Sequence, residues 1–244
     1  MPALNKANRQ VCDVDIRILK TMQPFLFFDT ANTTTAGLTG DAVYAMKKGT
    51  RAIAFQNPLE STMSLTAQVI PFKFYALLSD GVIETEAAYA KKETIKATTG
   101  GSLAIANAKA GSVFVFKTGE FGDEPIEGTY ADGTFTATTA GDIVADTNYE
   151  VGYIVVKDSG VKKVSFNNKK IPQDYYITMS TLDKDEVGVL TPFIMTAYKA
   201  SIQRDFELSF SSEGDPAELT LTFDLMEDKD GNVLDFVEDE SEAQ

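Results

Sequence analysis

Residues 198–210 read YKASIQRDFELSF, and residues 219–225 read LTLTFDL. In the first stretch the even positions are apolar apart from Arg204 and the odd positions are polar, and the second stretch alternates in the same way. A period of two is typical of a β-strand with one face against a core and the other in solvent. Residues 211–216, SSEGDP, favour a turn between them. We therefore predict two long antiparallel strands that form a hairpin.

Upstream of this hairpin, residues 50–55 (TRAIAF) and 61–69 (STMSLTAQV) also have the composition of strands. Pro71 suits the first position of a helix, and the following FKFYALL ends at Asp80 and Gly81, a typical helix stop. We predict a short helix over residues 72–78 that packs on the sheet. Residues 31–40 are rich in Thr, Asn and Gly, so we expect a mobile loop with a turn at the Gly37 and Gly40 pair.

The middle of the chain is rich in Thr, Ala and Gly, with short strands predicted at 112–117, 134–138 and 149–156. A turn is expected at Gly100 and Gly101, without the spacing of a phosphate-binding loop. The predicted fold is mainly antiparallel β, with one β domain formed by residues 1–95 and 157–238. This domain has an N-terminal arm (1–12) and an acidic C-terminal tail (227–244), and residues 96–156 form an inserted β-rich segment.

The composition excludes several kinds of chemistry. The 244-residue chain has no His, which removes Ser/His/Asp and Cys/His catalysis, and Cys12 is its single cysteine, so no intramolecular disulfide or CxxC site is available. A lone cysteine is consistent with folding in a reducing cytoplasm. The N-terminus lacks the apolar region of a signal peptide, and no stretch approaches 18 uninterrupted apolar residues, so we expect no membrane span.

The formal net charge is −14, and half of it lies at the C-terminus. Residues 227–244 contain eight acidic residues against Lys229 alone, a net charge of −7. Such a chain repels the phosphate backbone of nucleic acids instead of binding it. We interpret the acidic segment as a solvated tail.

Two clusters of carboxylates were weighed as sites. Residues 228–232, DKDGN, resemble part of a calcium loop, but the glycine falls at the fourth position where an EF-hand needs it at the sixth, so a tight turn is the better interpretation. Residues 183–186, DKDE, hold paired carboxylates of the kind glycosidases use, but the chain has no Trp to form a sugar platform, and a solvated loop is favoured. We predict no catalytic, cofactor-binding or metal-binding residues.

The order of elements is similar to a known family. A strand ending STMSLTAQVIP is followed at once by FKFYALLSDG, and the chain closes with YKASIQRDFELSFSSEGDPAELTLTFDLMEDKDGN. Over residues 40–90 and 165–235 this resembles the tail tube (major tail) proteins of tailed bacteriophages and of phage-derived tail particles. The resemblance implies a β-sandwich or barrel-like fold with one flanking helix. It also implies a non-enzymatic virion protein of the tail, assembled in the host cytoplasm, whose hexameric rings stack into a tube.

The resemblance also implies partners and a DNA channel. The partners would be further copies of the chain, other tail proteins (terminator, baseplate or tip, and sheath if the tail contracts), and DNA that passes without specific binding. On the polar face of the two C-terminal strands, Asp205, Glu207, Ser209 and Asp224 would face the lumen, where negative charge lets a duplex slide. An ordinary solvent face is the alternative. A capsid decoration or other virion protein, and a β-sandwich module that binds carbohydrate or a cell surface, also remain open.

Overall fold

The structure, a computed structural model, describes residues 5–208, 212–214 and 216–243. It divides into two compact units, one formed by Met1–Val82 with Ser165–Gln244 and the other by Ile83–Val164, which contains residues 96–156. All the strand pairs described are antiparallel, the one α-helix among them is short, and no described sheet closes into a barrel. The predicted mainly β, antiparallel fold with one short helix is confirmed.

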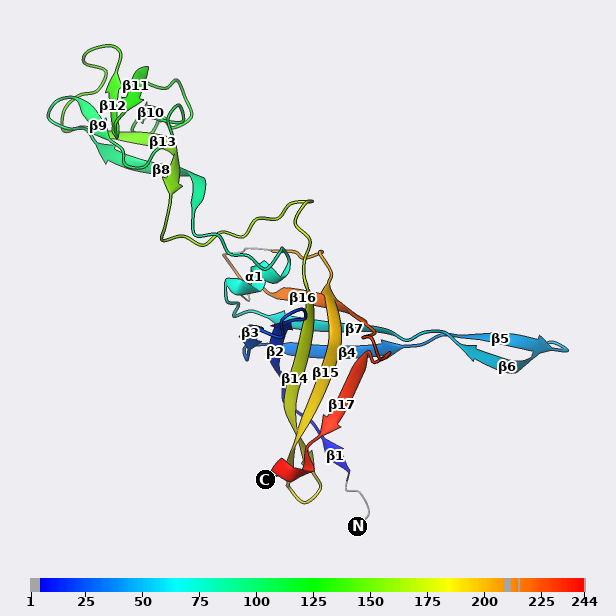
Figure 1. Ribbon diagram of the computed structural model, residues 1–244. Coiled ribbons are helices and arrows are strands. Elements are labelled where there is room, and N and C mark those ends of the chain that lie inside the picture. The colour runs from blue at the N-terminus through cyan, green and yellow to red at the C-terminus, as the bar shows by residue number, and fades with distance from the viewer. Residues whose placement is uncertain (1–4, 209–211, 215, 244) are drawn as a thin grey trace. The chain divides into compact units, whose positions relative to one another are not determined.

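The first unit is built on a nine-stranded sheet (Figure 1). Its principal strands are β2 (Asp13–Ile18), β3 (Pro24–Phe28), β4 (Thr33–Thr39), β7 (Glu60–Ala67), β14 (Asp174–Asp185), β15 (Leu190–Ile202) and β16 (Leu219–Met226). They lie in the order β3-β2-β14-β15-β16-β7-β4. Two shorter strands extend it: β1 (Lys6–Ala7) pairs with β14, and β17 (Leu234–Glu238) pairs with β15, followed by the 3-10 helix η1 (Glu240–Glu242).

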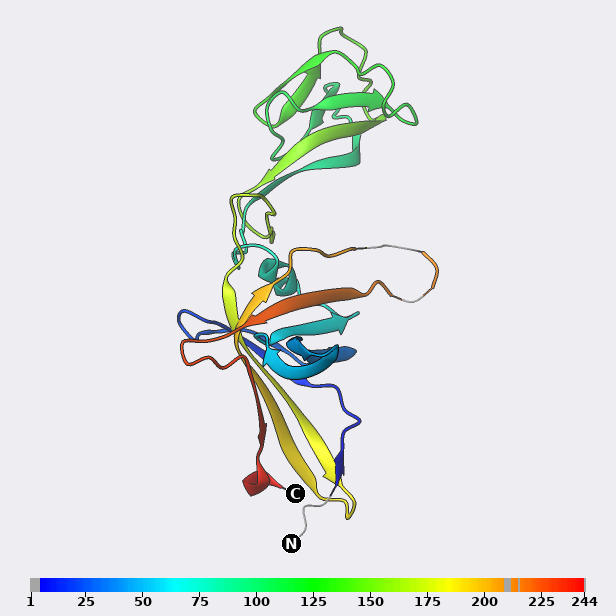
Figure 2. The same cartoon turned by 90° about the vertical axis from the view of Figure 1, so that its right-hand side faces the viewer.

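This sheet turns a corner between β15 and β16. The two strands are paired only from Lys199 with Met226 to Ile202 with Phe223. Beyond these positions they diverge, so the half formed by β3, β2, β14 and β15 and the half formed by β16, β7 and β4 run in crossed directions (Figures 1 and 2). A sheet that bends at a corner can bury the inner faces of both halves in one core.

The apolar side chains that alternate along the strands fill that core. Leu219, Leu221, Phe223 and Leu225 of β16 are buried, as are Met63, Leu65 and Ala67 of β7. The helix α1 (Lys73–Leu77) adds Phe74, whose ring centroid lies 5.0 Å from that of Phe28 on β3. Gly81, with φ +79°, ends the helix and donates its N–H to the Ala76 carbonyl at 3.0 Å. The predicted helix and its packing face are confirmed.

The predicted continuous strand over residues 198–210 is wrong in its extent. The strand β15 begins at Leu190 and ends at Ile202, and residues 203–208 have no regular structure. Alternation reports the environment of the side chains, but a strand also needs a partner for its backbone. The Gln203 N–H still bonds the Thr222 carbonyl of β16 at 2.8 Å, and beyond it the ladder ends. Phe206 packs instead on Phe166, with ring centroids 5.6 Å apart, and Phe210 lies outside the described residues.

The predicted loop over residues 31–40, with its turn at Gly37 and Gly40, is also wrong. Residues Thr33–Thr39 form β4, and Gly37 lies opposite Thr62 of β7 within the ladder. The pair continues outward as β5 (Ala42–Lys47) and β6 (Thr50–Gln56), a two-stranded sheet closed by Lys48 and Gly49 at φ +52° and +83°. Two positive φ values are what a two-residue hairpin turn requires.

The second unit has two three-stranded sheets around its own core. One has the strands β10 (Phe114–Lys117), β13 (Asn148–Lys157) and β8 (Ala87–Lys96), and the other β11 (Gly128–Ala131), β12 (Thr134–Ala137) and β9 (Ser102–Ala104). Leu103, Val115, Phe135 and Val151 are among the residues of the core cluster. The strands predicted at 112–117, 134–138 and 149–156 correspond to β10, β12 and β13. The turn at Gly100 and Gly101 is also confirmed, with Gly101 at φ +72°.

Candidate functional site

The solvent side of β4, β7 and β16 is lined almost entirely by short hydroxyl side chains, and we call it the threonine face. Successive residues of a strand point to opposite sides, so the positions between the buried ones share this face. Its members lie opposite one another in the ladders, Thr220 beside Thr66 and Thr222 beside Ser64 for example. The face comprises Thr33, Thr35, Gly37, Thr39, Glu60, Thr62, Ser64, Thr66, Thr220, Thr222 and Asp224.

Asp224 of β16 and Glu60 of β7 are the two charged members of the threonine face. Asp224 lies opposite Thr62, is exposed, and accepts a hydrogen bond from the Gln203 amide at 2.7 Å. The hydroxyls of Thr66 and Thr220 are 2.8 Å apart and bond to each other. Such pairs leave a flat surface with few long side chains, on which a passing polymer finds no fixed cation.

A hollow of about 560 Å³ adjoins this face. Its lining residues are Asp205, Phe206, Glu207, Glu218, Thr220 and Thr222. The lining therefore contains three carboxylates, from Asp205 and Glu207 after β15 and from Glu218 before β16, together with two hydroxyls of β16. It contains no Lys or Arg. At the corner, Lys199 lies opposite Met226, and its ammonium lies 3.9 Å from the Asp174 carboxylate.

Three of the four residues expected to face a lumen can now be placed. Asp224 lies on a strand, whereas Asp205 and Glu207 are exposed on the irregular segment after β15 and meet the threonine face at the hollow. Ser209 lies outside the described residues. Their role stays a prediction. The hydroxyl residues of β4 and β7 were missed, although the Thr33-Thr34-Thr35 run and the alternation of STMSLT could have indicated them.

The second notable surface is the two-stranded sheet of β5 and β6, residues 42–56, which we call the projecting hairpin. Cross-strand neighbours share a face, and Val43 lies opposite Phe55 while Ala45 lies opposite Ile53. Val43, Ile53 and Phe55 are 60%, 57% and 58% exposed. Two isolated strands are marginally stable in water unless a further layer covers their apolar face. This face has no such layer among the described residues.

Of the two carboxylate clusters weighed from the sequence, one is a turn and the other lies at the end of a strand. The Asp228 carboxylate accepts hydrogen bonds from the backbone N–H groups of Asn232 at 2.8 Å and Asp230 at 2.9 Å, and these bonds hold the pKa of Asp228 below its usual value. Asp185 accepts in the same way from Val187 and Val189 at 2.9 and 2.8 Å, closing the turn from β14 to β15. The turn interpretation of 228–232 is confirmed, and residues 183–185 belong to the end of β14 instead of a loop.

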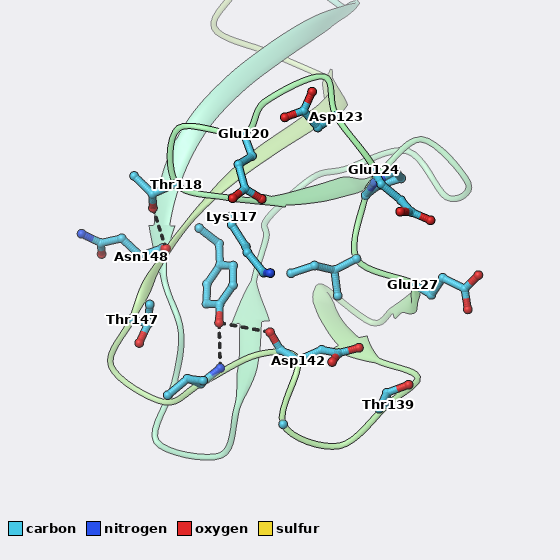
Figure 3. A pocket seen from close by; sticks show the side chains of 15 residues that line it. Lys117, Thr118, Glu120, Asp123, Glu124, Glu127, Thr139, Asp142, Thr147 and Asn148 are labelled. Atoms are coloured by element: carbon cyan, nitrogen blue, oxygen red, sulfur yellow. Dashed lines mark hydrogen bonds between the residues drawn. The ribbon is translucent and has the colours of Figure 1, made fainter.

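The second unit contains a hollow of about 790 Å³ (Figure 3). The Lys117 side chain extends into it, and carboxylates, including those of Glu120, Glu124 and Asp142, are spread around it without converging on one point. One wall is held by Tyr149, whose hydroxyl accepts from the Val144 N–H at 2.8 Å and donates to the Asp142 carbonyl at 3.2 Å. These contacts brace the loops and provide no arrangement for catalysis.

Across the part of the chain that the structure describes, no group of three or more His, Cys, Asp or Glu side chains could hold a metal ion. Within the same residues, no helix combines the length and the hydropathy needed to cross a membrane.

Comparison with known proteins assigns the chain to a family. No curated protein matches it. A model of the YomU/Tube protein family, however, matches residues 9–237, which include the strands of the threonine face, the projecting hairpin and the whole second unit. The chain therefore belongs to the YomU/Tube protein family, a family of phage tail tube proteins.

Proposed function

We propose that this protein is the structural subunit of a phage tail tube, and that its copies form hexameric rings that stack around a channel for DNA. Membership of a tube family supports a structural, non-enzymatic role in the virion tail and an oligomeric assembly. The terminator, the baseplate or tip proteins and, in a contractile tail, the sheath would be its other partners.

The observation that carries the assembly is the projecting hairpin. Val43, Ile53 and Phe55 are each more than half exposed on an isolated pair of strands, and they form the kind of surface that natural sheets cover. In an oligomer, a neighbouring subunit supplies the missing layer, and interfaces between permanent partners are accordingly more hydrophobic than the remaining surface. The hairpin is thus better suited to an assembled state than to a free monomer.

The threonine face supplies the channel wall in this proposal. Asp205, Glu207, Ser209 and Asp224 would line the lumen together with the hydroxyls of β4, β7 and β16. Non-specific DNA binding depends on contacts from Lys and Arg to phosphates, and the threonine face has neither. A wall of short hydroxyls and scattered carboxylates lets a duplex move along the tube without being held.

Electron microscopy and light scattering over a dilution series test the assembly. We expect rings or tubes to form as the protein concentration rises. The variant Val43→Ser with Ile53→Ser and Phe55→Ser should remain monomeric over the same range, because it removes the apolar face of the hairpin. A matched control replaces Phe114, Val144 and Val156 of the second unit by serine. These residues are 53%, 56% and 38% exposed, and this variant should assemble normally.

Two results would contradict the proposal. One is an unchanged protein that stays monomeric at every concentration and salt. The other is binding to preformed capsids without self-assembly, which would favour a decoration protein.

A further inference from the structure

The tip of the projecting hairpin is cationic in a strongly anionic protein. Residues 42–56 contain Lys47, Lys48 and Arg51 and no acidic residue, whereas the whole chain has a net charge of −14. All three cations are exposed. The Arg51 guanidinium lies over the Tyr44 ring, 4.3 Å from its centroid. Among the described residues none of the three cations forms an ion pair.

A surface of opposite character lies at the other end of the chain. On β17, Phe236 and Val237 are 55% and 47% exposed. Residues 238–242 follow with the sequence EDESE, which contains four carboxylates. We call residues 236–242 the acidic edge, because within the described residues β17 pairs only with β15 and its other edge is open (Figure 1).

Two of the four carboxylates on the acidic edge are available to a partner. Glu238 pairs with Lys6, and Asp239 caps η1, where hydrogen bonds from the Ser241 side chain and backbone hold the pKa of Asp239 below its usual value. Glu240 and Glu242 are exposed and form no ion pair among the described residues. The edge thus keeps free negative charge beside two exposed apolar side chains.

We propose that the projecting hairpin of one copy packs against the acidic edge of a second copy. Val43, Ile53 and Phe55 would cover Val237, while Lys47 and Lys48 would meet Glu240 and Glu242. Val237 lies on the opposite side of β17 from Phe236 and its stacking partner Phe193. This inference rests on the proposed self-assembly and names the surfaces that meet. Both surfaces combine apolar area with charge, and the charges are opposite, so the pairing matches in both respects.

A second copy fits the hairpin better than a nucleic acid does. Phosphates would satisfy the three cations, but a DNA backbone would leave the apolar face of Val43, Ile53 and Phe55 in water. A protein surface with exposed Val237 covers it. The opposite charges of Lys47 and Lys48 and of Glu240 and Glu242 then favour this alignment of the two surfaces over others, because bringing like charges together is unfavourable.

Charge exchange between the two surfaces tests the proposal. Lys47→Glu with Lys48→Glu, the tip variant, should raise the concentration for half-assembly at low salt about tenfold or more, as should Glu240→Lys with Glu242→Lys, the edge variant. Mixing the two variants, or combining all four substitutions, should return it to within about threefold of the unchanged protein. The control Lys109→Glu with Lys162→Glu makes the same charge change at exposed positions of the second unit and should have no such effect.

Each outcome separates this inference from the proposed function. If the unchanged protein never assembles, the proposed function fails and this inference falls with it. If the unchanged protein forms tubes and the tip variant forms them equally well, only this inference is overturned. A tip variant that is defective but not rescued by the edge variant also overturns it, because the partner surface then lies elsewhere. Normal tubes that lose affinity for duplex DNA would assign the tip to phosphates and overturn it as well.

Discussion

Replacing Asp224 by Lys should turn the threonine face from a surface that releases DNA into one that retains it. Asp224 is exposed on β16 and shares the face with one other carboxylate, that of Glu60 on β7, so the substitution reverses the sign of one of the two charges. The change is +2 per subunit, or about +12 in a ring of six, and each lysine lies where a passing phosphate could reach it. The subunit itself should lose little, about 0.5–1.5 kcal/mol, for the hydrogen bond with Gln203.

The expected magnitude follows from the number of lysines that reach the duplex. Each phosphate contact steepens the dependence of log K on log salt concentration by about 0.9 for double-stranded DNA. A duplex held by six to ten such contacts, from successive rings, would lose about 10³–10⁵ in affinity between about 50 and 200 mM salt. Tubes of the variant should therefore retain DNA at low salt and release it at high salt.

Co-sedimentation of purified tubes with linear duplex DNA over a salt series measures this effect. The matched control is Asp224→Asn, which keeps an acceptor for the Gln203 amide and removes the charge without adding a cation. It should retain far less DNA than Asp224→Lys. Well-formed Asp224→Lys tubes that retain no more DNA than the unchanged protein would show that this face does not line the channel.

Three further predictions concern the stability of the first unit. Leu221→Ala should lower the free energy of unfolding by about 2–5 kcal/mol, since Leu221 is fully buried, and Thr222→Ala on the opposite side by about 0.5 kcal/mol or less; urea denaturation that finds equal losses would contradict the assigned faces. Tyr175→Phe should leave stability unchanged or raise it by up to about 1 kcal/mol, because the Tyr175 hydroxyl is buried with no hydrogen-bond partner among the described residues; a clear loss in the same assay would indicate a partner. Partial burial pushes the pKa of Asp80 upward, but hydrogen bonds from Lys170 and the backbone outweigh this and leave it below the usual 3.8. The stabilisation that ionised Asp80 contributes to the fold is therefore present above about pH 4 and lost as the pH falls through the lowered pKa. Asp80→Asn should reduce the decrease of the melting temperature at acidic pH, measured by thermal unfolding.

The sequence was informative wherever a side chain reports its surroundings locally. Leu221 and Phe223 alternate with Thr220 and Thr222, and the structure buries the first pair and leaves the second on the solvent side. The short helix was also predictable, because a proline start, an apolar stripe and Gly81 are local signals.

Local signals failed where backbone pairing decided the structure. Residues 204–208 continue the alternation of β15 but form no strand, whereas the threonines of β4, which have the composition of a loop, pair with β7 from Glu60 to Thr66. Pairing depends on which distant segment lies alongside, and no property of the residue itself records this.

The sequence by itself determined a mainly β protein without histidine, strongly acidic, with an apolar and a polar side to its strands. Only the tertiary structure decided which polar residues share a surface and which apolar ones remain uncovered. Asp205 and Asp224 belong to segments that meet at the threonine face because the sheet turns its corner between β15 and β16. Val43 and Phe55 stay exposed although they have the composition of core residues, because the sheet ends before it reaches them. Whether an apolar side chain is buried depends on the neighbours that the fold places around it. A surface that another subunit covers can therefore be recognised only when all the contacts within the chain are known.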